Sequence, residues 1–206
     1  MFVLTADQHA SKRRGDKVED LLEHLGPWQH DHRDDVVLPL ERTVGDEVQI
    51  VLSSAEAALD LALRLIRLQD WAVGIGAGSV HEPLATSSRA SSGPAFVLAR
   101  SAVERARGRA EPMPVVVAGD DAAAATDATG LVQLLAAVVR RRSPAGWEVA
   151  DLLRPGVRQK EVAATLGISE QAVSQRVRSA VLEEERKVRP LAASLLRRAA
   201  GEKEDV

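Results

Sequence analysis

The sequence contains no cysteine, and only five of its 206 residues are aromatic. The absence of cysteine excludes disulfide frameworks, thiolate catalysis and cysteine-based zinc sites. The scarcity of aromatic residues means that any core must be built from Ala, Val and Leu. Hydrophobic residues make up 45% of the chain, which is enough for one large domain or two small ones.

The chain also lacks the features of a secreted or membrane-spanning protein. The stretch from Met1 to Arg14 has a short apolar run that turns polar at once, which is not the basic-then-apolar order of a signal peptide. No apolar run approaches the roughly 18 residues that a membrane helix needs. We therefore expect a cytoplasmic protein with no membrane contact.

The net charge of −3 conceals an uneven distribution. Residues 1–130 carry 13 Lys or Arg against 20 Asp or Glu, whereas residues 131–200 carry 13 against 7. A basic segment in an acidic chain is typical of a nucleic-acid-binding module, because neutralised phosphates release counterions. We predict a boundary near Gly130, between a domain over 1–130 and a domain over 131–206.

The periodicity of the first part predicts alternating strands and helices in the order β-α-β-β-α-β-α-β. The strands are expected at 2–6, 36–42, 48–52, 71–78 and 113–119, and the helices at 16–25, 54–69 and 93–108. Pro39 indicates that its strand lies at an edge or carries a bulge. This order favours an α+β sandwich with helices on one face of a mostly antiparallel sheet.

Acidic residues lie at two strand ends of this predicted sheet. Asp7 ends the first strand in "LTADQHAS", and Asp46 and Glu47 lie in the turn of "TVGDEVQIVL". This part resembles the catalytic core of class III nucleotide cyclases and diguanylate cyclases, which have a ferredoxin-like palm fold. The resemblance implies that Asp7 and Asp46, with Glu47 beside them, hold Mg²⁺ or Mn²⁺ and a nucleotide, since Mg²⁺ takes oxygen ligands.

The basic residues after Asp7 are candidates for phosphate binding. They are Lys12, Arg13 and Arg14 of "SKRR". The alternative for the whole region is structural: a Gly-Asp pair forms turns readily, and a basic loop is often only solvated. Both interpretations stay open on the sequence.

The resemblance to cyclases fails where the transition state should be stabilised. Those enzymes carry an Asn and an Arg on the helix of "AFVLARSAVERA", and here the matching positions are Val97 and Ser101. Losing such stabilisation commonly costs on the order of 100- to 1000-fold in rate. We therefore expect no cyclase activity.

The stretch "RQKEVAATLGISEQAVSQRVRSAVLEEE" resembles a helix-turn-helix of the kind found in sigma-factor region 4 and LuxR-type regulators. Its expected inward residues are Val162, Ala163, Leu166, Ile168, Val173, Val177, Ala180 and Val181, with Gly167 in the turn. Its second helix should carry base-reading side chains on the opposite face, because Gln pairs with adenine and Arg with guanine. The candidate DNA contacts are Arg158, Gln159, Lys160, Ser169, Gln171, Ser174, Gln175 and Arg178.

The combination of both parts resembles the SatD-like family of bacterial proteins, which joins a palm-like domain to a helix-turn-helix. "GDE", "SSGPAFVLAR" and "VAATLGISEQAVSQRV" carry this likeness. The resemblance implies a homodimeric transcriptional regulator of double-stranded DNA, with a degenerate cyclase-like domain as sensor or dimerisation unit. The alternatives are a metal-dependent protein acting on nucleoside triphosphates, for which the helix-turn-helix only provides localisation, and an adaptor that binds protein.

Overall fold

The structure is a computed structural model that describes residues 1–9 and 11–202, apart from the side chains of Lys12 and Arg14. A five-stranded sheet contains β1 (Phe2–Gln8), β2 (Val36–Arg42), β3 (Glu47–Leu52), β4 (Trp71–Ala77) and β5 (Val115–Gly119). The strand order is β2-β3-β1-β4-β5, and only β4 and β5 run parallel. The predicted α+β class and the mostly antiparallel sheet are confirmed.

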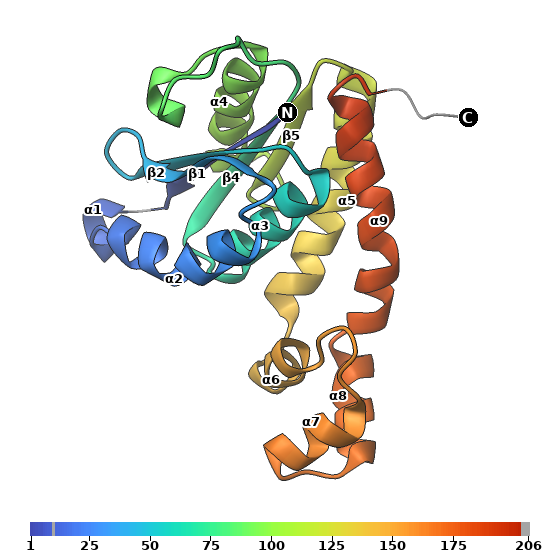
Figure 1. Cartoon of the computed structure of the whole chain (residues 1–206). Coiled ribbons are helices and arrows are strands. Elements are labelled where there is room, and N and C mark those ends of the chain that lie inside the picture. The colour runs from blue at the N-terminus through green and yellow to red at the C-terminus, as the bar shows by residue number, and fades with distance from the viewer. Residues whose placement is uncertain (10, 203–206) are drawn as a thin grey trace.

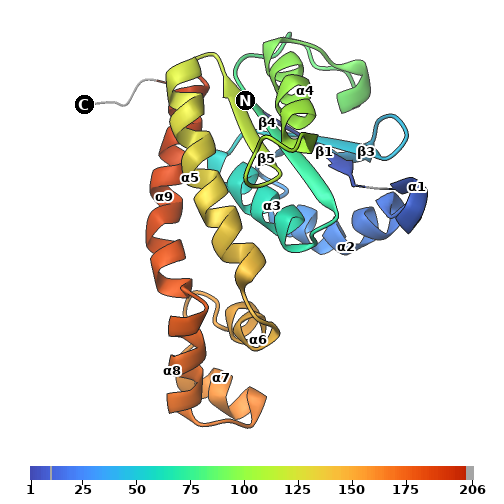
Figure 2. The same cartoon turned by 180° about the vertical axis from the view of Figure 1, so that it is seen from behind.

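Helices cover both faces of this sheet (Figures 1 and 2). One face packs on α2 (Val18–Asp31), α3 (Ala55–Arg67) and α5 (Ala122–Arg141), and the other on α4 (Pro94–Arg107). The prediction that all helices lie on one face is therefore wrong for α4. The physical reason is that both faces of the central strands are apolar and must be buried.

Two glycines of β4 explain how closely α4 approaches the sheet. A Cβ on Gly74 would lie 2.3 Å from the backbone nitrogen of Val103, and one on Gly76 would lie 2.0 Å from the carbonyl oxygen of Ala95. Neither distance is sterically possible for a larger residue. The glycines of this strand therefore admit a neighbouring backbone.

Local sequence signals placed several element ends correctly. β2 is the edge strand that Pro39 predicts, and its pairing with β3 is irregular between Val36 and Glu41. Ser54 caps α3, since its hydroxyl oxygen accepts a hydrogen bond from the Ala57 nitrogen at 3.2 Å. The short α1 (Ser11–Arg14) and the 3₁₀ turn η1 (Ser88–Ala90) complete this part.

The chain after α5 forms a small helical cluster and then returns to the sheet. It contains α6 (Pro144–Leu152), α7 (Gln159–Leu166), α8 (Glu170–Ser179) and α9 (Leu182–Ala199). Residues 143–181, called the α6–α8 unit below, have a core of their own. The sheet core, with the helices that cover it, is called the sheet unit. Ala192, Ala193, Leu196 and Ala199 of α9 pack into it beside α5.

This arrangement bears on the expected boundary near Gly130. That residue lies inside α5, which runs without a break to Arg141 and packs against the sheet along its length. Figure 1 shows α5 and α9 side by side, connecting the sheet to the α6–α8 unit. The two cores therefore separate after α5, and α9 belongs partly to each.

The helix α5 is long and apolar enough to cross a membrane by length and composition, contrary to the expectation from the sequence. Close to half of its apolar window is buried inside the protein. Its buried residues pack against β5, α3 and α9. These contacts make α5 part of the core of the sheet unit.

Candidate functional site

A three-residue turn joins α7 to α8. Gly167 has a φ of +65°, in the left-handed region that glycine adopts without steric cost. The hydroxyl oxygen of Ser169 accepts a hydrogen bond from the Ala172 nitrogen at 3.1 Å and so caps α8. The turn at Gly167 is therefore as the sequence predicts.

The inner faces of α7 and α8 pack on each other and on α6. Val162 and Val173 are among the buried residues of this core, and Ile168 packs against it from the turn. Val181 differs from its predicted inward position, because it is 38% exposed and has a φ of +53°. α8 has already ended at Ser179, so the chain turns at Val181 into α9 and does not continue the apolar face.

The outer face of α8 carries polar side chains that are free to meet a partner. Gln171, Gln175 and Arg178 are exposed and recur at i, i+4 and i+7, on one side of the helix. Ser174 is half-buried and accepts a hydrogen bond from Arg178 Nη1 at 3.2 Å. In Figures 1 and 2 this helix lies at the end of the molecule remote from the sheet.

The start of α7 lies near the same end of the molecule. Lys160 is exposed, and Gln159 is half-buried. Arg158 is exposed but its guanidinium pairs with Glu161 at 3.1 Å, and its backbone N–H donates to the same carboxylate at 3.0 Å. These two contacts from Arg158 hold the pKa of Glu161 below its usual range. Lys160 is therefore the less engaged cation of the two.

The positive charge of the second part is not concentrated on this surface. Residues 143–181 contain five Lys or Arg and four Asp or Glu. Arg142 instead forms a buried ion pair with Glu185, and Arg189 pairs with Asp60 at 2.8 Å. Arg197 likewise pairs with Glu56. Part of the excess of positive charge that the sequence shows is thus paired with acidic residues of α3 and α9, away from the outer face of α8.

A second candidate site lies where β1 and β3 end. Asp7 and Glu47 are directly opposite each other in the antiparallel register, so both face α4. Arg107 Nη1 lies 3.1 Å from Asp7 Oδ2, and Arg100 Nη1 lies 3.4 Å from Glu47 Oε2. Thr43 Oγ1 donates a hydrogen bond to Glu47 Oε1 at 2.6 Å. Each of these buried carboxylates therefore has an arginine partner from the same helix.

Burial is the main reason that the pKa of Asp7 is raised to about 6. The positive charge of Arg107 opposes this shift, whereas the nearby carboxylates of Asp46 and Glu47 add to it. Asp7 is thus a group whose charged form is destabilised in the folded protein.

Asp46 is half-buried in the turn between β2 and β3. Gly45 before it has a φ of +64°, and the carbonyl of Asp46 accepts a hydrogen bond from the Gln8 nitrogen at 3.1 Å. Beside the turn is an open cavity of about 690 Å³, lined by Gln8, Ser11, Arg13, Asp16, Arg42, Gly45, Asp46 and Arg107. Of the predicted phosphate-binding residues, Arg13 is exposed and reaches this cavity; the side chains of Lys12 and Arg14 lie outside the described part of the structure.

The acidic residues offer oxygen ligands of the kind that Mg²⁺ prefers. In the described residues, however, no three His, Asp or Glu side chains gather closely enough to hold a metal ion. Arg107 and Arg100 instead balance the charges of Asp7 and Glu47. The described donors thus fit a charge-compensated acidic pair better than a metal centre.

The two positions that should carry the cyclase Asn and Arg face solvent. Val97 is 71% exposed, and Ser101 is exposed as well. The arginines that do reach the acidic pair, Arg100 and Arg107, were not predicted to do so. Their seven-residue spacing on one helix was the available signal, because residues seven apart share a helical face.

Comparison with protein-family models, with curated proteins and with solved structures found no match to this chain. The functional assignment therefore depends on the chain's own residues and their geometry.

Proposed function

We propose that this protein is a transcriptional regulator that binds specific sequences of double-stranded DNA through α8 of a helix-turn-helix. The observation that carries this proposal is the exposed row of Gln171, Gln175 and Arg178 on a helix whose opposite face packs on α7. An α-helix fits the major groove, where Gln and Arg make paired hydrogen bonds with adenine and guanine. Lys160 and Arg158 would contact phosphates at the start of α7.

The near-neutral charge of the α6–α8 unit favours action as a homodimer. Phosphate contacts supply much of the affinity of a DNA-binding protein, and one copy of this unit offers few of them. Two copies bound to adjacent half-sites would double the number of contacts. Leu134 on α5 and Leu191 on α9 are 62% and 57% exposed, and apolar side chains of this size are suited to contact with a second copy.

The sheet unit is then a sensor or dimerisation unit derived from a cyclase-like domain. The succession β1-α2-β2-β3-α3-β4, with strand order β2-β3-β1-β4, supports a ferredoxin-like palm core of the kind seen in cyclases. Val97 and Ser101 support the loss of catalysis. A role within the SatD-like family is consistent with this combination of units.

A second function is favoured by the cavity beside Asp46. Its volume of about 690 Å³ and the presence of Arg13 and Arg107 suit a nucleoside triphosphate. The protein would then bind or act on nucleotides at the sheet unit, with or without Mg²⁺ or Mn²⁺, and the α6–α8 unit would place it on DNA. Product formation from ATP or GTP separates this function from regulation.

The test of the proposal is selection of DNA by the full-length protein from a random pool, followed by sequencing. Regulation through α8 predicts enrichment of one motif with two related half-sites. A pool that stays random after repeated rounds at about 100 mM salt would contradict the proposal.

A further inference from the structure

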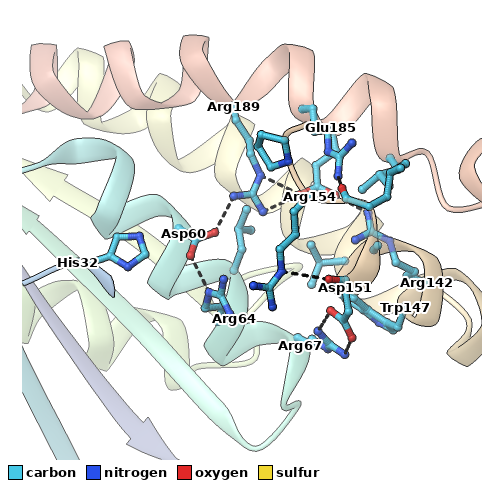
Figure 3. Close-up of a pocket in the computed structure, with 17 residues that line it drawn as sticks. His32, Asp60, Arg64, Arg67, Arg142, Trp147, Asp151, Arg154, Glu185 and Arg189 are labelled. Carbon is cyan, nitrogen blue, oxygen red and sulfur yellow. Dashed lines mark hydrogen bonds and ion pairs between the residues drawn. The ribbon is translucent and has the colours of Figure 1, made fainter. Parts of the chain in front are cut away.

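A cavity of about 500 Å³ lies between the sheet unit and the α6–α8 unit (Figure 3). Its walls come from α3, the end of α5, α6 with the loop that follows it, and α9, and His32 just after α2 also lines it. Apolar side chains form part of the lining, namely Leu63, Val139, Ala150, Leu153, Pro155 and Leu182. The cavity is thus built from segments of both units and has the size of a typical small-molecule site.

Positive charge exceeds negative charge in this cavity. Six arginines line it against three carboxylates, so the lining carries a net charge of +3. The arginines are Arg64, Arg67, Arg142, Arg154, Arg186 and Arg189, and the carboxylates are Asp60, Asp151 and Glu185. Such an excess favours an anion, because the guanidinium fork matches phosphate and carboxylate oxygens.

Two of the carboxylates each serve two arginines. Asp60 lies 2.6 Å from Arg64 Nε and 2.8 Å from Arg189 Nη1. Glu185 pairs with Arg142 and, at 2.7 Å, with Arg189. Burial raises the pKa of Asp60, but the hydrogen bonds from Arg64 and Arg189 outweigh it and lower the pKa overall. Asp60 is therefore ionised, and both carboxylates already pair with two arginines each, so the six arginines of the lining outnumber the acids available to them.

Arg154 provides the least compensated charge. Its Nε donates a hydrogen bond to the backbone oxygen of Asp151 at 3.3 Å, and no carboxylate pairs with it among the described residues. The carboxylate of Asp151 is occupied by Arg67, which binds it with two nitrogens at 2.7 and 2.8 Å. Figure 3 shows Arg154 extending across the cavity toward α3. An incoming anion would find this guanidinium available.

The ring of Trp147 contacts two of the arginines and is therefore not available for stacking with a ligand. The guanidinium carbon of Arg67 lies 3.7 Å from the centre of its ring, and that of Arg142 lies 4.4 Å from it. These cation–π contacts hold both side chains in place. Recognition in this cavity therefore depends on charge and not on stacking against the indole.

We propose that the cavity binds a small molecule carrying a diphosphate or triphosphate group. The net charge of +3 matches such a group, and Arg154 is its principal ligand. Arg64 is exposed and bonds Asp60 through Nε, so its terminal nitrogens provide the second set of donors. The apolar part of the lining accommodates the remainder of an organic phosphate. Because α3 belongs to the sheet unit and α6 to the α6–α8 unit, the bound molecule contacts both units and bridges them.

Titration calorimetry on the full-length protein, in EDTA and without DNA, tests this site. The probes are inorganic pyrophosphate and ATP, which share the phosphate chemistry and differ in the organic part. Arg154→Ala and Arg64→Ala are each expected to weaken binding roughly tenfold or more, because each removes a charge-assisted hydrogen bond. Equal affinity for both probes would show that the phosphates alone are recognised. A higher affinity for ATP would show that the apolar lining also contacts the organic part.

Two further variants make the result specific to this cavity. Arg198→Ala removes an exposed arginine of α9 outside the cavity and should bind like the wild type. Arg107→Ala alters the cavity beside Asp46, so any binding of the probes that is lost in this variant belongs to that cavity and not to this one. Absence of binding by folded wild type overturns the proposal and identifies the arginines as purely structural. Binding that survives in Arg154→Ala and Arg64→Ala, or disappears in Arg107→Ala, overturns it as well.

Discussion

Arg189 on α9 reaches the carboxylate of Asp60 on α3 at 2.8 Å, although 129 positions separate the two residues in the sequence. Asp60 also accepts hydrogen bonds from the indole nitrogen of Trp28 at 2.8 Å and from Arg64 at 2.6 Å. One carboxylate thus joins α2, α3 and α9. It connects the helix that follows the α6–α8 unit to the core of the sheet unit.

Replacement of Asp60 by alanine should destabilise the protein. The change leaves the Trp28 N–H without its acceptor and two arginines without a shared partner, which should cost about 1–3 kcal/mol of unfolding free energy. Urea unfolding at pH 7 measures the cost. The control is Glu104→Ala, which removes an exposed partner of Arg100 and should change stability by less than about 0.5 kcal/mol. Equal losses in both variants would contradict a linking role for Asp60.

The raised pKa of Asp7 predicts a specific pH dependence of stability. Its folded-state value of about 6 lies above the ordinary value of 3.8, so the folded chain binds the proton more tightly between these values. Stability from this group is therefore highest below about pH 4 and falls as the pH rises to about 6. Asp7→Asn removes this titrating group. The melting temperature of the variant, relative to that of the wild type, should therefore rise between about pH 4 and pH 6. The control is Asp127→Asn at an exposed position, whose plot of melting temperature against pH should be parallel to that of the wild type. A parallel plot for Asp7→Asn would contradict the raised pKa.

Arg107 balances the acidic pair in the way that a metal ion would. Arg107→Ala leaves Asp7, Glu47 and Asp46 with one cation fewer, so it should lower the melting temperature at pH 7.5. Added Mg²⁺ or Mn²⁺ should restore part of that loss in the variant and change the wild type little. The measurement is melting temperature against metal concentration. A large metal-dependent rise in wild type, abolished by Asp46→Asn, would instead support a native metal site.

Incubation of the protein with ATP or GTP and Mg²⁺ or Mn²⁺ should yield no cyclic nucleotide or cyclic dinucleotide above background. Val97 cannot hydrogen-bond a ribose, and Ser101 cannot neutralise a phosphate, as Asn and Arg would. Chromatography of the nucleotides detects any product. Turnover that disappears in Asp46→Asn would overturn the interpretation of a degenerate site and favour the enzyme.

Features that depend on neighbouring residues, such as helix starts and turns, could be predicted from the sequence. Features that depend on contacts between separate elements could not. Ser54 and Gly167 act through local hydrogen bonds and backbone angles, so the start of the helix near residue 54 and the α7–α8 turn were predicted correctly. The position of α4 depends on its tertiary contact with the glycines of β4. The periodicity of one helix does not reveal which face of a sheet the helix covers.

Charge was the least predictable property of the candidate sites. Arg142 is the last of three consecutive arginines at the end of α5, yet it is buried against Glu185. A count of Lys and Arg over residues 131–200 does not distinguish buried arginines such as this one from exposed ones on α8. The same limit applies to Arg154, whose place in a cavity depends on α3 and α9 together.

Binding of the phosphate compound described above should also influence DNA. The bound compound bridges the two units. If the protein binds DNA as proposed, saturating ligand should change the affinity for DNA by about 5- to 150-fold. DNA should then change the affinity for the ligand by the same factor. Fluorescence anisotropy with and without the ligand measures this. Ligand binding without any change in DNA affinity would refute the coupling while leaving the cavity assignment intact.

The most direct test of DNA recognition by α8 compares variants of the full-length protein on the selected duplex and on a scrambled one. Gln175→Ala and Arg178→Ala should each weaken binding to the selected duplex by about 1–3 kcal/mol, relax the preference at one base pair and leave scrambled binding nearly unchanged. Lys160→Ala should weaken both duplexes alike and lower the salt dependence. If Gln175→Ala and Arg178→Ala bound both duplexes as the wild type does, α8 would not be the reading helix and the central claim would be wrong.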